Sequence, residues 1–329
     1  MAINHRKNSH IKKEEINFAL IGSGAIAKTH IDAFNSLRET RLRGVLSLSD
    51  CKKSLDMANQ LGIKSYNSFK EVLNDKDIDA VDIIAKNNLH ARLGIAAANC
   101  GKHILVEKPI ATSLKDADRL IETCKKNKVK LSVISQNRFI PSYINFKKNI
   151  EKNKFGKINL AVFSWIIRKN KNYFNSSPWR KSKREAGGGL LIMNLIHYID
   201  LLQWFLGPVF SVYGEIKNFK HKMGVEDTVC AVLKFENGTL GIGYGTTAAS
   251  VGFPPAIKIY GTEGSVELID SDYLITSKDI FAEQIRDFSR AILEDKKPAV
   301  DGMDGKNSLR TVLAIYQSAR LKKEIFISC

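Results

Sequence analysis

The stretch Ile16–Ala27 reads Ile-Asn-Phe-Ala-Leu-Ile-Gly-Ser-Gly-Ala-Ile-Ala, and it predicts the fold of the first half of the chain. Its mostly apolar beginning has the length of a strand and contains no proline. Gly22 permits a tight turn after that strand, and Gly24 lets the backbone approach a pyrophosphate closely. The following helix begins near Ala25 and Ile26, so its N-terminal amides point at the same phosphates. We therefore predict a strand, turn and helix that hold a dinucleotide.

An acidic residue follows the next predicted strand, 43–48, in the run Ser49-Asp50. Asp50 is placed to accept hydrogen bonds from the adenosine ribose hydroxyls, and its charge would repel a 2′-phosphate. This favours NAD over NADP, although Lys52 and Lys53 offset part of the repulsion. The competing interpretation is a βαβ unit without a nucleotide. The order of strand, glycines, helix, strand and acid argues against it.

Composition is typical of a soluble enzyme with two domains. The chain has 329 residues, of which 44% are hydrophobic, and it is long enough to bury a sizeable core. We find no apolar stretch long enough to span a bilayer, and we expect a cytoplasmic protein with a loose polar extension at 1–15. The five scattered cysteines form no Cys-x-x-Cys pair, which predicts reduced thiols, no disulfide framework and no metal site.

The chain is strongly basic, with a net charge of +17 from 51 Lys and Arg against 34 Asp and Glu. These residues are spread out, without a helix-turn-helix, zinc finger or aromatic-interleaved patch, so we expect no nucleic-acid partner. One basic cluster lies within 168–184. Most such runs form solvated loops, but its place shortly before the apolar run 190–206, which we expect to form a helix of the active site, also suits attraction of an anionic substrate.

Two patterns of secondary structure divide the chain near residue 136. Up to that point strands alternate with helices, which predicts an α/β Rossmann domain at 16–136 with a doubly wound, mostly parallel sheet. Beyond it, strands follow one another, with turns at Asn237-Gly238 and Glu263-Gly264. We therefore predict an α+β domain at 137–329 with a largely antiparallel open sheet.

Several short motifs together resemble the Gfo/Idh/MocA oxidoreductase family, the group of glucose–fructose oxidoreductase and inositol dehydrogenase. They are Gly22–Ala27, Leu89-His90, Gly101–Pro109, Gln136-Asn137-Arg138, Trp179-Arg180, Gly187–Gly189 and Ile196–Asp200. The most specific are Glu-Lys-Pro after a strand and a triple glycine eight residues before a helical histidine. The resemblance covers nearly the whole chain. It implies that the second sheet covers the nicotinamide end of NAD and that its open face forms a homodimer or homotetramer.

The resemblance also implies which residues bind the cofactor and which react. NAD contacts are expected from Gly22, Gly24, Ala25, Ile26, Asp50, Ala85, Asn87, His90, Glu107, Lys108, Gln136, Trp179 and Arg180. Lys108 and His197 are the implied catalytic pair. An imidazole titrates near neutrality and suits removal of a hydroxyl proton, while an ammonium stabilises developing alkoxide charge. The alternatives are a capping or surface lysine and a structural histidine on an apolar helix.

The chain departs from the family pattern at three places. Met193 stands where Asp or Asn is usual, four residues before His197, and a thioether does not orient an imidazole as a carboxylate does. Asn194 is the nearest substitute for that carboxylate. The loop Ala85-Lys86-Asn87 lacks the usual threonine and proline, and Lys181 replaces a glycine.

Substrate contacts are expected from Lys108, Arg138, Asn194 and His197. Arg138, Trp179 and Arg180 could also hold a diphosphate, because Arg pairs bidentately with phosphate and Trp offers a flat face to a sugar or base. The stretch 173–204 most resembles members that oxidise C3 of a UDP-N-acetyl sugar or its uronic acid for surface polysaccharides. A free inositol or sugar dehydrogenase is the alternative. Met193 keeps open a third hypothesis, a regulatory protein that binds NAD without turnover.

Overall fold

The computed structural model describes residues 14–269 and 277–327, so most of the expected extension 1–15 lies outside the described residues. Six strands form a parallel sheet in the order β3-β2-β1-β4-β5-β6, which confirms the predicted Rossmann-type sheet. They are β1 (Ile16–Ile21), β2 (Thr40–Leu46), β3 (Lys64–Ser65), β4 (Ala80–Ile83), β5 (His103–Val106) and β6 (Leu131–Val133). Between them lie the helices α1 (Ala27–Asn35), α2 (Cys51–Leu61), α3 (Phe69–Asn74), α4 (His90–Asn99) and α5 (Leu114–Lys126).

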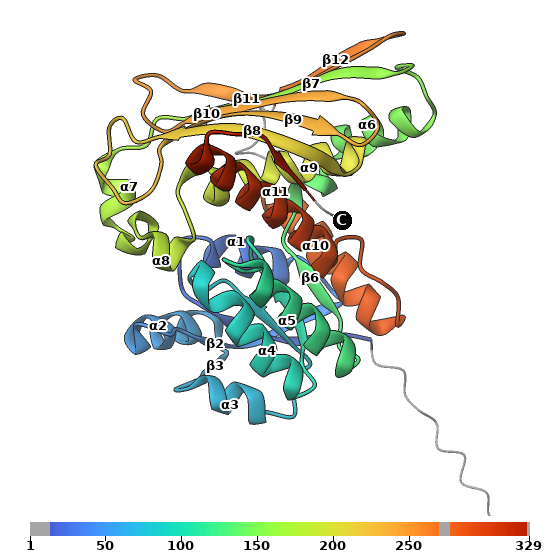
Figure 1. The fold of residues 1–329 in the computed structure, drawn as a ribbon. Helices are drawn as coiled ribbons and strands as arrows, with labels where there is room; N and C mark the ends of the chain where they lie inside the picture. Colours follow the sequence, from blue (N-terminus) through green and yellow to red (C-terminus); the bar gives the residue numbers. More distant parts are fainter. Residues whose placement is uncertain (1–13, 270–276, 328–329) are drawn as a thin grey trace, which may run out of the picture.

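Helices cover both faces of this sheet because its central strand is apolar on both. Ile21 of β1 belongs to the core cluster that contains residues of α4 and α5, whereas Phe18 packs with residues of α1. Helix α10 (Ser277–Leu293) covers the α1 side as well, and its Phe288 ring lies 6.3 Å from the ring of Phe18. The chain therefore returns to the first sheet after building the second (Figure 1). The domain division at residue 136 stays a prediction.

Within the described residues, seven strands form the second sheet, in the order β12-β11-β7-β10-β9-β8-β13. They are β7 (Ile158–Ile166), β8 (Val209–Lys217), β9 (Thr228–Phe235), β10 (Leu240–Thr246), β11 (Phe253–Gly261), β12 (Ser265–Ile269) and β13 (Ile325–Phe326). All pairs are antiparallel except β7 with β10, which confirms the largely antiparallel α+β domain. Helices α9 (Ile196–Leu206) and α11 (Gly302–Leu321) lie between this sheet and the first domain (Figure 1). The remaining helices are α6 (Pro141–Glu151), α7 (Lys171–Asn175) and α8 (Lys183–Ala186).

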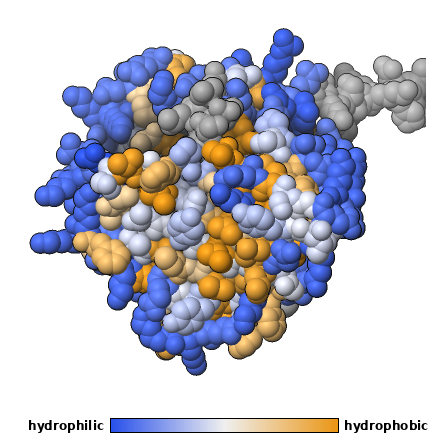
Figure 2. All heavy atoms as spheres, turned by 90° about the horizontal axis from the view of Figure 1, so that it is seen from above, coloured by the Kyte–Doolittle hydropathy of each residue, from blue (hydrophilic) through white to orange (hydrophobic). Residues whose placement is uncertain are grey.

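The other face of the second sheet brings apolar side chains to the surface. Tyr213, Val232, Leu240, Ile242 and Tyr244 are each between 38% and 50% exposed. The strand register places Tyr213, Val232 and Ile242 side by side on β8, β9 and β10. Figure 2 looks onto this face, where apolar residues gather near the centre and hydrophilic residues form the rim.

One stretch contradicts the expectation that no segment is apolar and long enough to span a bilayer. Lys183–Leu206 has 24 residues and a mean hydropathy of 1.4 in its most apolar window, but 78% of that window is buried inside the protein. Nearly every residue of α9 is buried, because the helix packs between the second sheet and the first domain. Such burial on all sides explains the apolar composition, and α9 is a core helix.

Candidate active site

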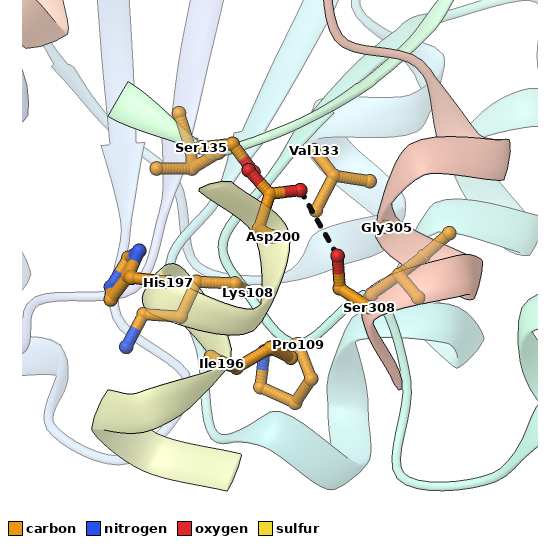
Figure 3. A pocket seen from close by; sticks show the side chains of 11 residues that line it. Lys108, Pro109, Val133, Ser135, Ile196, His197, Asp200, Gly305 and Ser308 are labelled. Carbon is orange, nitrogen blue, oxygen red and sulfur yellow. Dashed lines mark hydrogen bonds between the residues drawn. The ribbon is translucent and has the colours of Figure 1, made fainter. Parts of the chain in front are cut away.

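The two residues of the implied catalytic pair come from different domains. Lys108 follows β5 at the carboxyl edge of the first sheet, and His197 lies in the first turn of α9. Both line one hollow of about 240 Å³. Figure 3 shows their side chains extending to the same side, away from Asp200 and Ser308. The ammonium and the imidazole therefore converge on one place.

A π-helical turn, Leu191–Leu195, precedes α9 and determines how Lys108 is held. Such a turn changes the register of the helical hydrogen bonds, and it often occurs at functional sites. The carbonyl oxygen of Met193 accepts a hydrogen bond of 2.5 Å from Lys108 Nζ. The Met193 sulfur accepts a longer one, 3.2 Å, from Asn87 Nδ2. Met193 thus contributes its backbone carbonyl to the site. The sequence predicted only the effect of its thioether.

The triple glycine lets this turn begin directly against Glu226. A Cβ atom on Gly189 would lie 2.1 Å from the Glu226 carbonyl oxygen, and one on Gly188 would lie 2.1 Å from Tyr316 Oη. Without side chains there, the Glu226 carboxylate accepts hydrogen bonds of 2.9 Å from the amides of Gly189 and Leu191. These are amides that the start of a helix leaves without helical partners. The glycines therefore position the helix that carries His197.

Burial limits the positive charge that the catalytic pair can carry. Burial and the charge of Lys108 lower the pKa of His197 to about 3. Burial also lowers the pKa of Lys108; Glu107 opposes this shift, and the charge of Arg180 adds to it. Two positive charges in one buried hollow repel each other strongly. The pair therefore carries at most one positive charge at neutral pH, and His197 is neutral.

A buried ionic network lies next to Lys108, and the sequence analysis missed it. Glu107 Oε2 accepts the Lys108 backbone N–H at 3.0 Å, and Glu107 Oε1 lies 3.2 Å from His30 Nε2. The other ring nitrogen of His30 lies 2.6 Å from Asp82 Oδ2. An imidazole between two ionised carboxylates donates from both nitrogens, and the raised pKa of His30 agrees with this cation.

The turn after β1 fits a pyrophosphate. Gly22 has a φ of 130°, and a Cβ there would lie 2.8 Å from the Ile84 carbonyl oxygen. A Cβ on Gly24 would meet no atom within 4 Å among the described residues, so the space beside it is open. Helix α1 begins after Ile26 without a side-chain cap, which leaves amide donors near Ala25 for an anion.

Asp50 lies near this turn, because β2 pairs with β1 up to Ile21 and Leu46. Its side chain is exposed, and it serves as the N-cap of α2 by accepting a hydrogen bond of 3.0 Å at Oδ1 from the Lys53 amide. One carboxylate oxygen is thus engaged by the helix. The contact of Asp50 with a ribose stays a prediction.

His90 joins the loop after β4 to the turn after Lys108. Its Nε2 lies 2.9 Å from the Ala85 carbonyl oxygen, and its Nδ1 lies 2.8 Å from the Pro109 carbonyl oxygen. Both nitrogens are therefore used to hold these two loops together. A direct contact of His90 or Ala85 with NAD stays a prediction.

The loop Ala85-Lys86-Asn87, which lacks the threonine and proline usual in the family, makes side-chain contacts with α8. Lys86 Nζ donates to Glu185 Oε1 at 2.6 Å, and Asn87 Nδ2 donates to the Ala186 carbonyl oxygen at 2.8 Å. Both bonds cross from the first domain to the second. They tie the two domains together beside Met193.

Arg138, expected at the substrate, is enclosed by acidic residues. Its Nε and Nη2 donate to Asp200 at 2.8 and 2.7 Å, and its Nη1 donates to Asp304 at 3.1 Å. All three nitrogens are thus engaged, so binding a substrate would compete with these bonds. The neighbouring Gln136 is buried, and its Oε1 has no hydrogen-bond partner within the described residues. The expected roles of both residues stay predictions.

The other predicted site residues lie in the second domain. Trp179 and Arg180 belong to the turn Pro178–Lys181, with the Arg180 guanidinium 5.8 Å from the Trp179 ring. Asn194 and Arg180 line a second hollow that also contains Met193. Their contacts with a cofactor or substrate stay predictions.

A parallel sheet with an open glycine turn and a buried lysine–histidine pair at its carboxyl edge defines a nicotinamide-dependent dehydrogenase. Comparison with known families agrees. The oxidoreductase family with an NAD-binding Rossmann fold matches residues 16–135, and the GFO/IDH/MocA C-terminal domain matches residues 143–267. The chain belongs to the Gfo/Idh/MocA oxidoreductase family. It is an NAD-dependent enzyme of the sugar and inositol dehydrogenase group.

Relatives of the chain act on sugars or inositols, as their names state. It is 26% identical to the myo-inositol 2-dehydrogenase of Thermotoga maritima, over 94% of this chain and 98% of that protein. It is 28% identical to the 1,5-anhydro-D-fructose reductase of Ensifer adhaerens, over 92% and 96%. The WlbA dehydrogenase from Bordetella pertussis, solved with NADH and UDP-GlcNAcA, has a TM-score of 0.89 and 27% identity over 97% of this chain and 99% of that one.

Proposed function

We propose that this enzyme moves a hydride between NAD and a secondary hydroxyl of a nucleotide-linked sugar, at C3 of a UDP-N-acetyl sugar or its uronic acid. The observation that carries the proposal is that the polar ends of Lys108 and His197 extend to the same side, close enough for the charge of Lys108 to act on the imidazole. The likeness to the WlbA dehydrogenase supports the nucleotide-linked substrate. We extend the proposal to surface polysaccharide synthesis in the cytoplasm, where the free Cys51, Cys100, Cys124 and Cys230 would stay reduced.

The two side chains divide the proton chemistry between them. NAD bound along the first sheet would accept the hydride. The neutral imidazole of His197 accepts the hydroxyl proton, and the Lys108 ammonium donates to the same oxygen and offsets its negative charge. A weak base suffices because the hydroxyl becomes strongly acidic as its carbon turns into a carbonyl carbon. The Met193 carbonyl and the Glu107 carboxylate hold Lys108 in place for this step.

Replacing His197 with alanine is expected to lower kcat at least ~100-fold, the scale of a lost general base. Turnover is measured as NADH formation and NADH affinity by fluorescence, and the affinity should stay close to that of the parent protein. His103→Ala is the matched control, because His103 lies at the opposite end of β5 from Lys108. An unchanged rate in His197→Ala would reject the role of this residue.

A free inositol or sugar dehydrogenase is the second candidate, favoured by the likeness to myo-inositol 2-dehydrogenase along nearly the whole chain. A fluorescence screen for NADH formation across UDP-sugars and inositols separates the two candidates. Turnover of myo-inositol without turnover of any UDP-sugar would replace the first proposal by the second. Binding of NADH without turnover of any sugar would favour the NAD-binding regulator.

We also propose that the open face of the second sheet joins two or four copies of the chain. The adjacent apolar side chains of Tyr213, Val232 and Ile242 would leave water in such a contact, and isologous contacts of this kind are common in homo-oligomers. Ile242→Lys places a charge in this row and is expected to yield monomers by light scattering. A monomeric parent protein would contradict the proposal.

A further inference from the structure

A second hollow, of about 300 Å³, lies beside the π-helical turn that precedes His197. Its lining includes Tyr173, Arg180, Met193 and Asn194. Met193 belongs to both places, because its carbonyl oxygen holds Lys108. The hollow is therefore near a substrate whose hydroxyl lies at Lys108.

Two cations meet on one aromatic ring at the edge of the hollow. Lys169 Nζ and the Arg180 guanidinium each lie 4.4 Å from the centre of the Tyr173 ring. Arg180 Nη1 donates to the Tyr173 carbonyl oxygen at 3.1 Å, which fixes the guanidinium beside the ring. Its Nε is buried and has no hydrogen-bond partner within the described part of the chain. A buried N–H of a cation without an acceptor is costly, so this geometry points to an absent ligand.

The positive charges of this region repel one another. Burial and the charge of Arg180 lower the pKa of Lys169, and Arg180 acts on Lys108 in the same direction. Glu226 lines the hollow, but its carboxylate already accepts the amides of Gly189 and Leu191 and the Tyr316 hydroxyl. Among the described residues, neither Lys169 nor Arg180 forms an ion pair with an acidic side chain. An anionic ligand would relieve this repulsion.

We propose that this hollow binds an anionic group of the substrate, a phosphate or a carboxylate, at the Arg180 guanidinium, with the Lys169 ammonium nearby against the Tyr173 ring. The proposal rests on the proposed dehydrogenase for the reaction and adds the chemistry of its substrate. Arg180 offers the planar fork that pairs with either group, and Lys169 adds a point charge. Of the two arginines that the sequence analysis expected to hold a diphosphate, Arg138 is already engaged by Asp200 and Asp304.

The experiment uses the full chain, saturated with NADH, and titrates UDP and D-glucuronate separately by calorimetry. Lys169→Gln is expected to weaken the binding of at least one of these probes roughly tenfold, the effect of losing one charge-assisted contact. Lys169→Arg keeps the charge and is expected to retain most of the affinity. Lys171→Gln is the matched control, because Lys171 is exposed in the same basic run. NADH affinity, measured by fluorescence, reports whether each variant keeps its fold and its cofactor site.

A loss confined to UDP assigns the hollow to a phosphate, and a loss confined to glucuronate assigns it to a carboxylate. Equal binding by Lys169→Gln and the parent protein overturns the proposal, as does a parent protein that binds neither probe. A comparable loss of NADH affinity also overturns it, because the anion would then belong to the cofactor. The proposed dehydrogenase fails on a different result, the absence of NADH formation with every sugar tested.

Discussion

Replacing Lys108 with methionine is expected to reduce kcat about 1,000-fold, within the range of roughly 10²–10⁴ that a positioned proton donor or acceptor supplies. Methionine keeps most of the length and apolar volume of the side chain but has no ammonium. The reacting oxygen then loses its charged donor inside a buried hollow, where such interactions are strongest. NADH formation at saturating substrate measures kcat, and the fluorescence of bound NADH shows whether the cofactor still binds.

Lys102 provides a matched control for this substitution. Lys102 precedes β5 and is also buried. Its Nζ donates to the carbonyl oxygens of Asp75 at 2.6 Å and Ile78 at 2.8 Å. Lys102→Met should therefore lower the free energy of unfolding and preserve kcat in the folded protein. The assignment of Lys108 would be wrong if Lys108→Met kept a kcat within about tenfold of the parent value.

The carboxyl edge of the first sheet is predictable because each of its features is local in sequence. A strand followed by Gly22 and Gly24 has a backbone that leaves room for a pyrophosphate, and the run Glu107-Lys108 marks the end of another strand. Parallel strands bring their carboxyl ends to one edge. The alternation of strands and helices thus predicts that distant residues meet. His197 was expected from the resemblance of its motif to the family, and the structure adds that the glycines before it permit a close approach to Glu226.

Contacts between residues that belong to no recognisable sequence motif could not be predicted in this way. His30 lies in a helix and Asp82 in a buried strand, and their meeting with Glu107 depends on the strand order β1-β4-β5. Arg138 looked like a phosphate ligand because its acidic partners, Asp200 and Asp304, come from helices much later in the chain. The contact of Lys108 with the π-helical turn was also not predictable. It involves the backbone carbonyl of Met193, and the identity of a residue does not reveal where its carbonyl points.

Replacing His30 with leucine is expected to lower the free energy of unfolding by about 3–5 kcal/mol, the scale of a buried ion pair broken on one side. His30 and Asp82 are fully buried, and the variant leaves the Asp82 and Glu107 carboxylates without their cation. Urea denaturation measures the loss. The double variant His30→Leu/Asp82→Leu should recover part of it, because one unpaired charge is removed with its partner. A single variant as stable as the parent protein would show that the cluster needs no cation.

The pH dependence of stability tests the charge of His30 independently. Burial alone would lower the pKa of His30, but the charges and hydrogen bonds of Asp82 and Glu107 raise it from 6.5 to about 10. Because the folded value exceeds the unfolded one, the stabilisation is complete below about pH 6.5 and is lost as the pH rises toward 10. Across that window this group should lower the free energy of unfolding by up to about 1.4 kcal/mol per pH unit. The double variant His30→Leu/Asp82→Leu lacks this contribution and also the unpaired Asp82 carboxylate, so its profile should be flatter than that of the parent protein. Parallel profiles would mean that His30 is neutral when folded, and that the two carboxylates share a proton instead.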